Sequence, residues 1–145
     1  MSLYFEEFTP GRSFVGPAPR TVSDKTVRDF AEVSGDKNRL HLDDSFARSS
    51  PFGERIAHGL LGLSIASGLL HELGIIAETV VAFAALDWKF KGPILIGDRL
   101  SMRMEVVKAR PHGPDKGLVI LEAQLTNQDG KLIGTGSWSV WVKRR

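Results

Sequence analysis

The chain has 145 residues, of which 42% are hydrophobic and 25% charged, and its 19 basic and 17 acidic residues leave a net charge of +2. This length and composition predict one globular domain, spanning residues 1–145. The balanced charge argues against a nucleic-acid partner. The sequence has no cysteine, which excludes disulfides, thiolate metal sites and thiol catalysis.

The N-terminal segment is interrupted by prolines and glycines up to residue 19. It predicts only short edge strands, over residues 12–15 and 20–22. It also carries acidic residues where a signal peptide needs a basic region and an apolar run. The longest apolar run, Leu60 to Leu70, is too short to span a bilayer. We therefore expect a soluble, cytoplasmic protein with no membrane partner.

A first helix is predicted from Asp24 to Ser34. Ser23 suits the N-cap position, Asp24 complements the helix dipole in the first turn, and Gly35 ends the helix. The chain is then expected to be loop from Asp36 to His41. A second, short helix is expected to start near residue 43 or 44 and to end within residues 49–53, which contain serine, proline and glycine.

The clearest predicted helix runs from Gly59 to Leu73, with Gly74 as its C-terminal signal. It is apolar or small nearly all round, which indicates a helix buried on most sides. Glycine and alanine at one face would let another chain segment approach closely. Ser64, Ser67 and His71 form a polar stripe at helical spacing.

The second half of the chain predicts a sheet. β-branched, aromatic and alternating apolar residues indicate strands over residues 79–91, 100–110, 118–126 and 132–142. Turn residues at 111–115 and 127–130 separate the last three strands. Long antiparallel strands after one buried helix indicate an α+β domain, in which a curved antiparallel sheet wraps a central helix.

Asp36, Asn38 and His41 form a candidate catalytic group between two helices. A carboxylate near an imidazole can share a water molecule, so that one group takes a proton while the other returns one. The residues alone also allow a structural interpretation, in which Asp36 forms a turn and His41 makes a local hydrogen bond. Both interpretations stay open at this point.

His58 and Gly59 precede and begin the buried helix. The Gly59 amide is placed to polarise a carbonyl oxygen, although a glycine there also permits a tight turn. We interpret His58 as a structural capping or loop histidine, because it lacks an obvious carboxylate partner. Ser67 is placed to donate to Asp36 or a substrate, or back to its own helix. No compact two-histidine helix motif is present, so we expect no metal.

Three blocks of this sequence resemble the MaoC-like dehydratases, the (R)-specific enoyl-CoA hydratases. The first is SGDKNRLH at residues 34–41, with Asp43 and Phe46-Ala47 after it; the others are residues 58–68 and 90–98. The resemblance covers about residues 10–143. It implies a hotdog fold, in which the central helix lies in a curled antiparallel sheet and two protomers join sheets, so a homodimer or higher homo-oligomer is expected.

The resemblance also implies reversible hydration of a trans-2-enoyl-CoA thioester to a (3R)-hydroxyacyl-CoA, with no cofactor beyond the CoA of the substrate. Asp36 and His41 would be the catalytic dyad around the attacking water, and Asn38 would support the loop. The Gly59 amide would hold the thioester oxygen, and Ser67 would support the site by hydrogen bonding.

One residue departs from the family pattern. The family usually has proline after the asparagine, where this chain has Arg39. The change frees the backbone and adds a cation that can pair with Asp43, Asp44 or an acidic group of the ligand. We expect it to alter substrate preference rather than abolish activity.

Two other functions remain as alternatives. The first is a hotdog acyl-CoA thioesterase, which often uses a carboxylate near or on the central helix; between Gly59 and Leu70 this helix has no acid. The second is a non-catalytic subunit that binds acyl-CoA. The presence of both Asp36 and His41 argues against it, because binding alone needs no acid–base pair.

Overall fold

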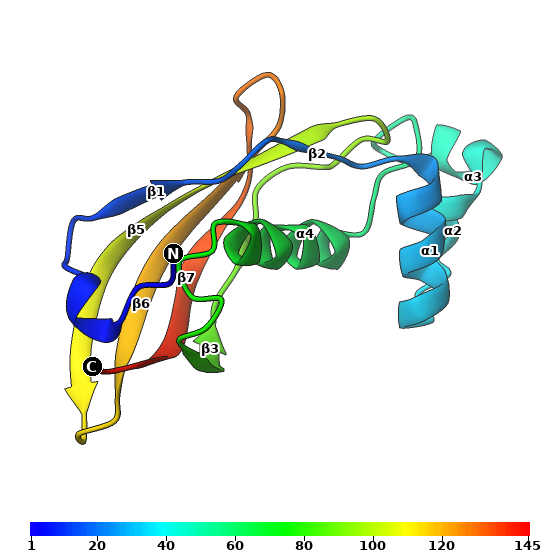
Figure 1. The fold of residues 1–145 in the computed structure, drawn as a ribbon. Coiled ribbons are helices and arrows are strands. Elements are labelled where there is room, and N and C mark those ends of the chain that lie inside the picture. Colours follow the sequence, from blue (N-terminus) through cyan, green and yellow to red (C-terminus); the bar gives the residue numbers. More distant parts are fainter.

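A seven-stranded antiparallel sheet forms the body of the structure, a computed structural model that describes residues 1–145 (Figure 1). Its hydrogen-bonded order is β1-β5-β6-β7-β3. The long strands are β5 (Arg99–His112), β6 (Lys116–Thr126) and β7 (Leu132–Lys143). The short strands β1 (Ser13–Val15) and β2 (Arg20–Thr21) pair with β5, whereas β3 (Val80–Leu86) and β4 (Lys89–Phe90) pair with β7.

The central helix α4 (Gly59–Glu72) lies across one face of this sheet (Figure 1). Alternate side chains of β5, β6 and β7 are buried, as the period of two along a strand requires. They pack with Ile65, Leu69 and other side chains of α4 in one hydrophobic cluster. None of the helices combines the length and apolar composition needed to cross a lipid bilayer.

The remaining helices lie together beyond the N-terminal end of α4, away from the long strands (Figure 1). They are α1 (Asp24–Ser34), α2 (Arg39–Leu42) and α3 (Asp44–Arg48); a 3-10 turn, η1 (Phe5–Glu7), lies near the N-terminus instead. This arrangement brings the loop between α1 and α2 close to the start of α4. Residues far apart in the sequence therefore meet at one end of the central helix.

The structure confirms the α+β architecture and most of the predicted elements. Ser23 caps α1 by accepting a hydrogen bond from the Thr26 amide at 3.1 Å. Gly35 ends α1 with φ of 77°, a left-handed conformation that glycine adopts without steric cost. Helix α3, helix α4 and the three long strands lie where the sequence placed them, to within a few residues.

Two predicted boundaries are wrong. The expected loop from Asp36 to His41 contains the start of α2, because the Asn38 side chain accepts from the Leu40 amide and caps a short helix. The single strand expected over residues 79–91 is divided into β3 and β4. Its interruption at Asp87 and Trp88 packs against Gly134 and Gly136 of β7, where any Cβ atom would collide with it.

Candidate active site

The loop after α1 is shaped by three short hydrogen-bonded turns. The Ser34 hydroxyl accepts from the Asp36 amide at 3.1 Å, and the Asp36 carboxylate accepts from the Asn38 amide at 3.2 Å. The Asn38 side chain then accepts from the Leu40 amide at 2.9 Å. Asp and Asn favour such turns because their side-chain oxygens reach backbone amides two residues on. Asn38 thereby fixes the start of the helix that carries His41.

Each of two histidines has one ring nitrogen bonded to a backbone carbonyl. His41 Nδ1 lies 2.8 Å from the Ile56 carbonyl oxygen, and His58 Nε2 lies 2.8 Å from that of Asp36. A carbonyl oxygen only accepts, so both nitrogens carry hydrogen. His41 Nε2 and His58 Nδ1 are therefore the nitrogens left for other chemistry.

The structure brings Asp36, His41 and His58 into one cluster. One ligand atom of each lies within 4.8 Å of the others, and the two imidazole centroids are 3.9 Å apart. Asp36 is exposed, His41 is half-buried, and His58 is buried. A carboxylate and an imidazole at this separation, facing solvent, can share a water molecule between them. The proximity of Asp36 and His41 agrees with the pattern that singled them out.

For His58, the capping alternative of the prediction is wrong. His58 occupies the N-cap position of α4, but its side chain makes no capping hydrogen bond. The ring instead bonds to the Asp36 backbone and stacks on His41. The only signal in the sequence was a histidine immediately before a buried helix. The carbonyl that His58 contacts lies 22 residues earlier, and its position depends on how α1 lies against α4.

Gly59 begins α4 next to this cluster. The first amides of a helix have no carbonyl acceptor within the helix, and they favour negative charge. Glycine also has a packing role here, since a Cβ at Gly59 would lie 2.7 Å from the Phe90 ring. The helix start thus has a free polar edge and an aromatic side chain pressed against it.

A cavity of about 520 Å³ opens beside Gly59. It lies between the first two turns of α4 and residues 88–94, and its walls are mainly hydrophobic. Lys91 is the only charged residue in its lining. This cavity suits an apolar group of a ligand whose polar part lies at the helix start.

Ser67 is not brought to this cluster within one chain. It lies eight residues beyond Gly59, about 12 Å along the helix axis. Its hydroxyl donates to the Ser64 carbonyl at 2.7 Å, which matches the alternative of a bond within its own helix. It lines a separate cavity of about 190 Å³ with Phe83, Leu86 and others.

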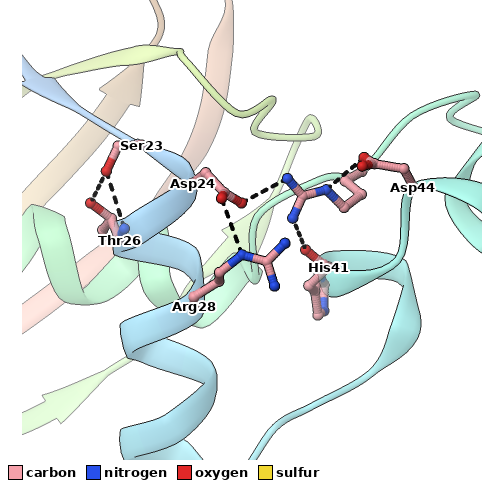
Figure 2. Close-up of polar contacts among 7 residues, drawn as sticks. Ser23, Asp24, Thr26, Arg28, His41 and Asp44 are labelled. Atoms are coloured by element: carbon pink, nitrogen blue, oxygen red, sulfur yellow. Dashed lines mark hydrogen bonds and ion pairs between the residues drawn. The ribbon is translucent and has the colours of Figure 1, made fainter.

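Arg55 holds the helices around the site together. Figure 2 shows Asp24, His41 and Asp44 close together, with dashed lines marking polar contacts. The Arg55 guanidinium donates to the Asp24 and Asp44 carboxylates at 2.7 and 2.8 Å and to the His41 carbonyl at 3.3 Å. Hydrogen bonds from Arg55, and then from Arg28, hold the pKa of Asp24 below its ordinary value. One side chain therefore joins α1, α2 and α3.

Arg39, the departure from the family pattern, pairs with Asp43 rather than with Asp44. Its guanidinium donates to the Asp43 carboxylate at 2.9 Å and lies 4.7 Å from the centroid of the Phe46 ring. The Phe46 amide, and then Arg39, lower the pKa of Asp43. These contacts lie on the outer surface of α2 and α3.

Asp36, His41 and His58 also have the composition of a metal site. The two imidazole rings, however, lie face against face, with their centroids 3.9 Å apart and their planes 31° apart. Imidazole lone pairs lie in the ring plane, so stacked rings do not direct them readily at one ion. The arrangement suits proton transfer better than metal binding.

Known proteins resemble this chain over most of its length. Residues 6–128 match the model of the family described as MaoC like domain. The 3-hydroxybutyryl-CoA dehydratase of Methylorubrum extorquens is 33% identical over 109 residues, covering 75% of this chain and 67% of that protein. The (R)-specific enoyl-CoA hydratase of Aeromonas caviae is 34% identical over 110 residues, covering 76% of this chain and 78% of that protein.

Solved structures agree with the fold. A monoamine oxidase regulatory protein from Archaeoglobus fulgius gives a TM-score of 0.93 at 32% identity, covering 99% of this chain and 96% of that one. A MaoC-like dehydratase from Rhodospirillum rubrum gives 0.88 at 27% identity, covering 99% of each. A Mycobacterium tuberculosis protein with a double hotdog fold gives 0.85 at 22% identity, covering 99% of this chain and 45% of that one.

These similarities confirm the expected hotdog fold, which the arrangement of α4 against the antiparallel sheet already indicated. The matched family model covers the candidate site as well as most of the sheet. The chain belongs to the family of MaoC-like dehydratase domains.

Proposed function

We propose that this chain is an (R)-specific enoyl-CoA hydratase, which adds water reversibly to trans-2-enoyl-CoA thioesters and so also acts as a (3R)-hydroxyacyl-CoA dehydratase. The observation that carries the proposal is the clustering of Asp36 and His41 at the start of α4, next to a cavity with apolar walls. Two relatives named as enzymes of this reaction class support it.

The proposed chemistry follows from the hydrogen bonds of the site. His41 Nδ1 is engaged by the Ile56 carbonyl, so Nε2 presents a lone pair, and the Asp36 carboxylate is open to solvent. A water held between them loses one proton to the pair as its oxygen bonds to C3 of the enoyl group. The pair delivers one proton to C2, so that H and OH are added and the dyad is regenerated.

Gly59 has a separate part in this proposal. When oxygen adds at C3, negative charge develops on the thioester oxygen as an enolate. An amide at a helix start is a fixed donor for that charge and needs no reorganisation during the reaction. The acyl chain would enter the cavity of about 520 Å³ that begins at Gly59. No metal or additional cofactor enters this scheme, and a chelator is expected to leave the rate unchanged.

We also propose that two copies of the chain associate through β3. All seven residues of this strand are exposed, including Val81, Phe83 and Leu86. β3 is an edge of the sheet, and an exposed apolar edge is a template for pairing with another strand. The cavity at Ser67 lies beside this strand, so a second copy paired there would cover it.

Hydration of trans-2-enoyl-CoA substrates tests the proposal. The wild-type protein is expected to remove the enoyl-thioester absorbance and to yield the (3R)-hydroxy product. Asp36→Asn keeps the side-chain shape and the acceptor for Asn38, and it should lower kcat by about 10²- to 10⁴-fold, as should His41→Ala. Asp29→Asn, an exposed α1 residue paired with Lys25, is the matched control and should keep the wild-type rate.

Other outcomes would contradict the assignment. Wild-type turnover by both dyad variants would reject the roles of Asp36 and His41. Release of free CoA from saturated acyl-CoA would indicate a thioesterase, although the only acid on α4 is Glu72 at its last residue, where it pairs with Arg20. Tight thioester binding without turnover would indicate a binding subunit.

A further inference from the structure

His58 has surroundings that an ordinary loop histidine would not need. Its side chain is only 2% exposed, and it contacts the Phe30 ring of α1 edge-on at 4.9 Å and the His41 ring at 3.9 Å. Its Nδ1 is buried without any hydrogen-bond partner. A buried polar atom without a partner costs about 1–3 kcal/mol, so such atoms are rare in stable proteins. The free-energy cost of burying His58 Nδ1 beside the candidate site suggests that the ring has a role in that site.

The single hydrogen bond of His58 defines its protonation. Nε2 donates to the Asp36 carbonyl at 2.8 Å, so the hydrogen lies on Nε2. A second hydrogen on Nδ1 would bury both a positive charge and an unpaired donor. The ring is therefore neutral, in the Nε2–H tautomer. Asp36 and His41 are the titratable side chains that face it.

A neutral ring in this place acts on both members of the dyad. Its Nε2–H fixes the backbone of Asp36, and its face lies against His41, with the two ring planes 31° apart. The face of an aromatic ring attracts a cation, whereas a charged imidazole would repel one. When His41 takes up a proton, a neutral His58 supports the resulting charge.

From these contacts we infer that His58 is a positioning residue of the proposed hydration. It sets the separation of Asp36 and His41 through the Asp36 backbone, and it holds a neutral ring against His41 while His41 carries a proton. This inference rests on the proposed function for its effect on turnover. Its structural content, the neutral Nε2–H ring, is independent of activity.

Two substitutions separate the hydrogen bond from the ring. His58→Phe keeps a ring against His41 but removes the donor to Asp36, whereas His58→Gln keeps a side-chain N–H donor but removes the ring. We expect His58→Phe to lower kcat by about 10- to 100-fold with little change in KM, because small displacements of reacting groups have effects of this size. His58→Gln should recover most of that loss.

The pH profile provides a readout that a purely structural role would not change. Without the ring, a positive charge on His41 is less well supported, so the His58→Gln variant should show a pH–rate profile displaced from that of the wild-type protein. His71→Gln, at an exposed position near the other end of α4, is the matched control and should leave both kcat and the profile unchanged.

Nitrogen-15 NMR of the histidine rings of the wild-type protein completes the test. His58 is expected to show the Nε2–H tautomer, with its hydrogen on the nitrogen that faces the Asp36 carbonyl. An Nδ1–H tautomer at His58, or a His58→Phe variant with wild-type kcat, would overturn the inference. Failure of the wild-type protein to hydrate any enoyl-CoA would reject the proposed function instead, and the NMR result would stand apart from it.

Discussion

The body around α4 is held by apolar packing and a continuous backbone hydrogen-bond ladder, whereas α1, α2 and α3 contribute few side chains to that packing, Val27 among them, and are joined to one another by polar side chains. Strands β5, β6 and β7 pair along nearly their whole length, and alternate side chains of β6, β7 and the first half of β5 are buried in the hydrophobic cluster. Helix α2 has no buried residue at all. It is fixed by the Asn38 cap and by Arg55.

The side chains that contribute most to stability and the side chains of the candidate site therefore lie in different regions. In the body, removing one side chain lowers the free energy of unfolding but leaves the surface of the site unchanged. At the helical edge, removing one hydrogen bond alters the position of Asp36 or His41 at a smaller cost in stability. A rigid scaffold that carries functional residues on its periphery is a common arrangement. Substitutions in the body should therefore change mainly the free energy of unfolding, and substitutions at the helical edge should change mainly kcat.

The largest expected effect on stability lies in the body. Leu69 of α4 is fully buried in the hydrophobic cluster. Leu69→Ala should lower the free energy of unfolding by about 2–5 kcal/mol, because it removes buried methyl groups and leaves a cavity. Denaturant unfolding measures this loss. The fraction of protein that remains folded should keep its kcat, and a large drop in kcat per folded molecule would break the separation of the two regions.

An intermediate and mixed effect is expected at Arg55. Its side chain is 10% exposed and joins Asp24, Asp44 and the His41 carbonyl. Arg55→Ala should lower the free energy of unfolding by about 1–3 kcal/mol, because charged groups lose hydrogen bonds in a partly buried place.

Arg55→Ala should also lower kcat, because the His41 carbonyl loses its hydrogen bond from Arg55. Arg28→Ala is the control, since Arg28 shares Asp24 but is bonded to neither His41 nor Asp44. Thermal unfolding and initial rates, measured for both variants, distinguish a loss of stability from a loss of His41 positioning. Equal kcat values for both would mean that Arg55 stabilises the helices without positioning His41.

The smallest effect on stability is expected at Arg39. It is the first residue of α2, a position that accepts proline because its amide has no acceptor within the helix. Arg39→Pro loses the exposed ion pair with Asp43, which contributes little in water, and gains a comparable stabilisation from a less flexible unfolded chain. Thermal unfolding should change little, while relative kcat/KM values for short and branched enoyl-CoA substrates should change. A marked loss of stability would contradict this account.

Much of the fold could be predicted from local patterns. Ser23 and Gly35 bound α1 because capping and left-handed turns depend on nearby residues. The alternation of apolar residues located β5, β6 and β7, since strand burial has a period of two. The interruption at Asp87 and Trp88 could not be predicted. It depends on the glycines of β7, which lie about 50 residues further along the chain.

The sequence by itself determined which groups were available for chemistry: Asp36 and His41 in a short polar segment, a glycine at the start of the one apolar helix, and a match to a known family pattern. Only the tertiary structure decided how these groups meet. It placed His58 against both Asp36 and His41 and left Ser67 bonded within its own helix. Such contacts depend on how α1 and α4 are oriented, and that orientation is set by long-range packing rather than by the residues next to each group.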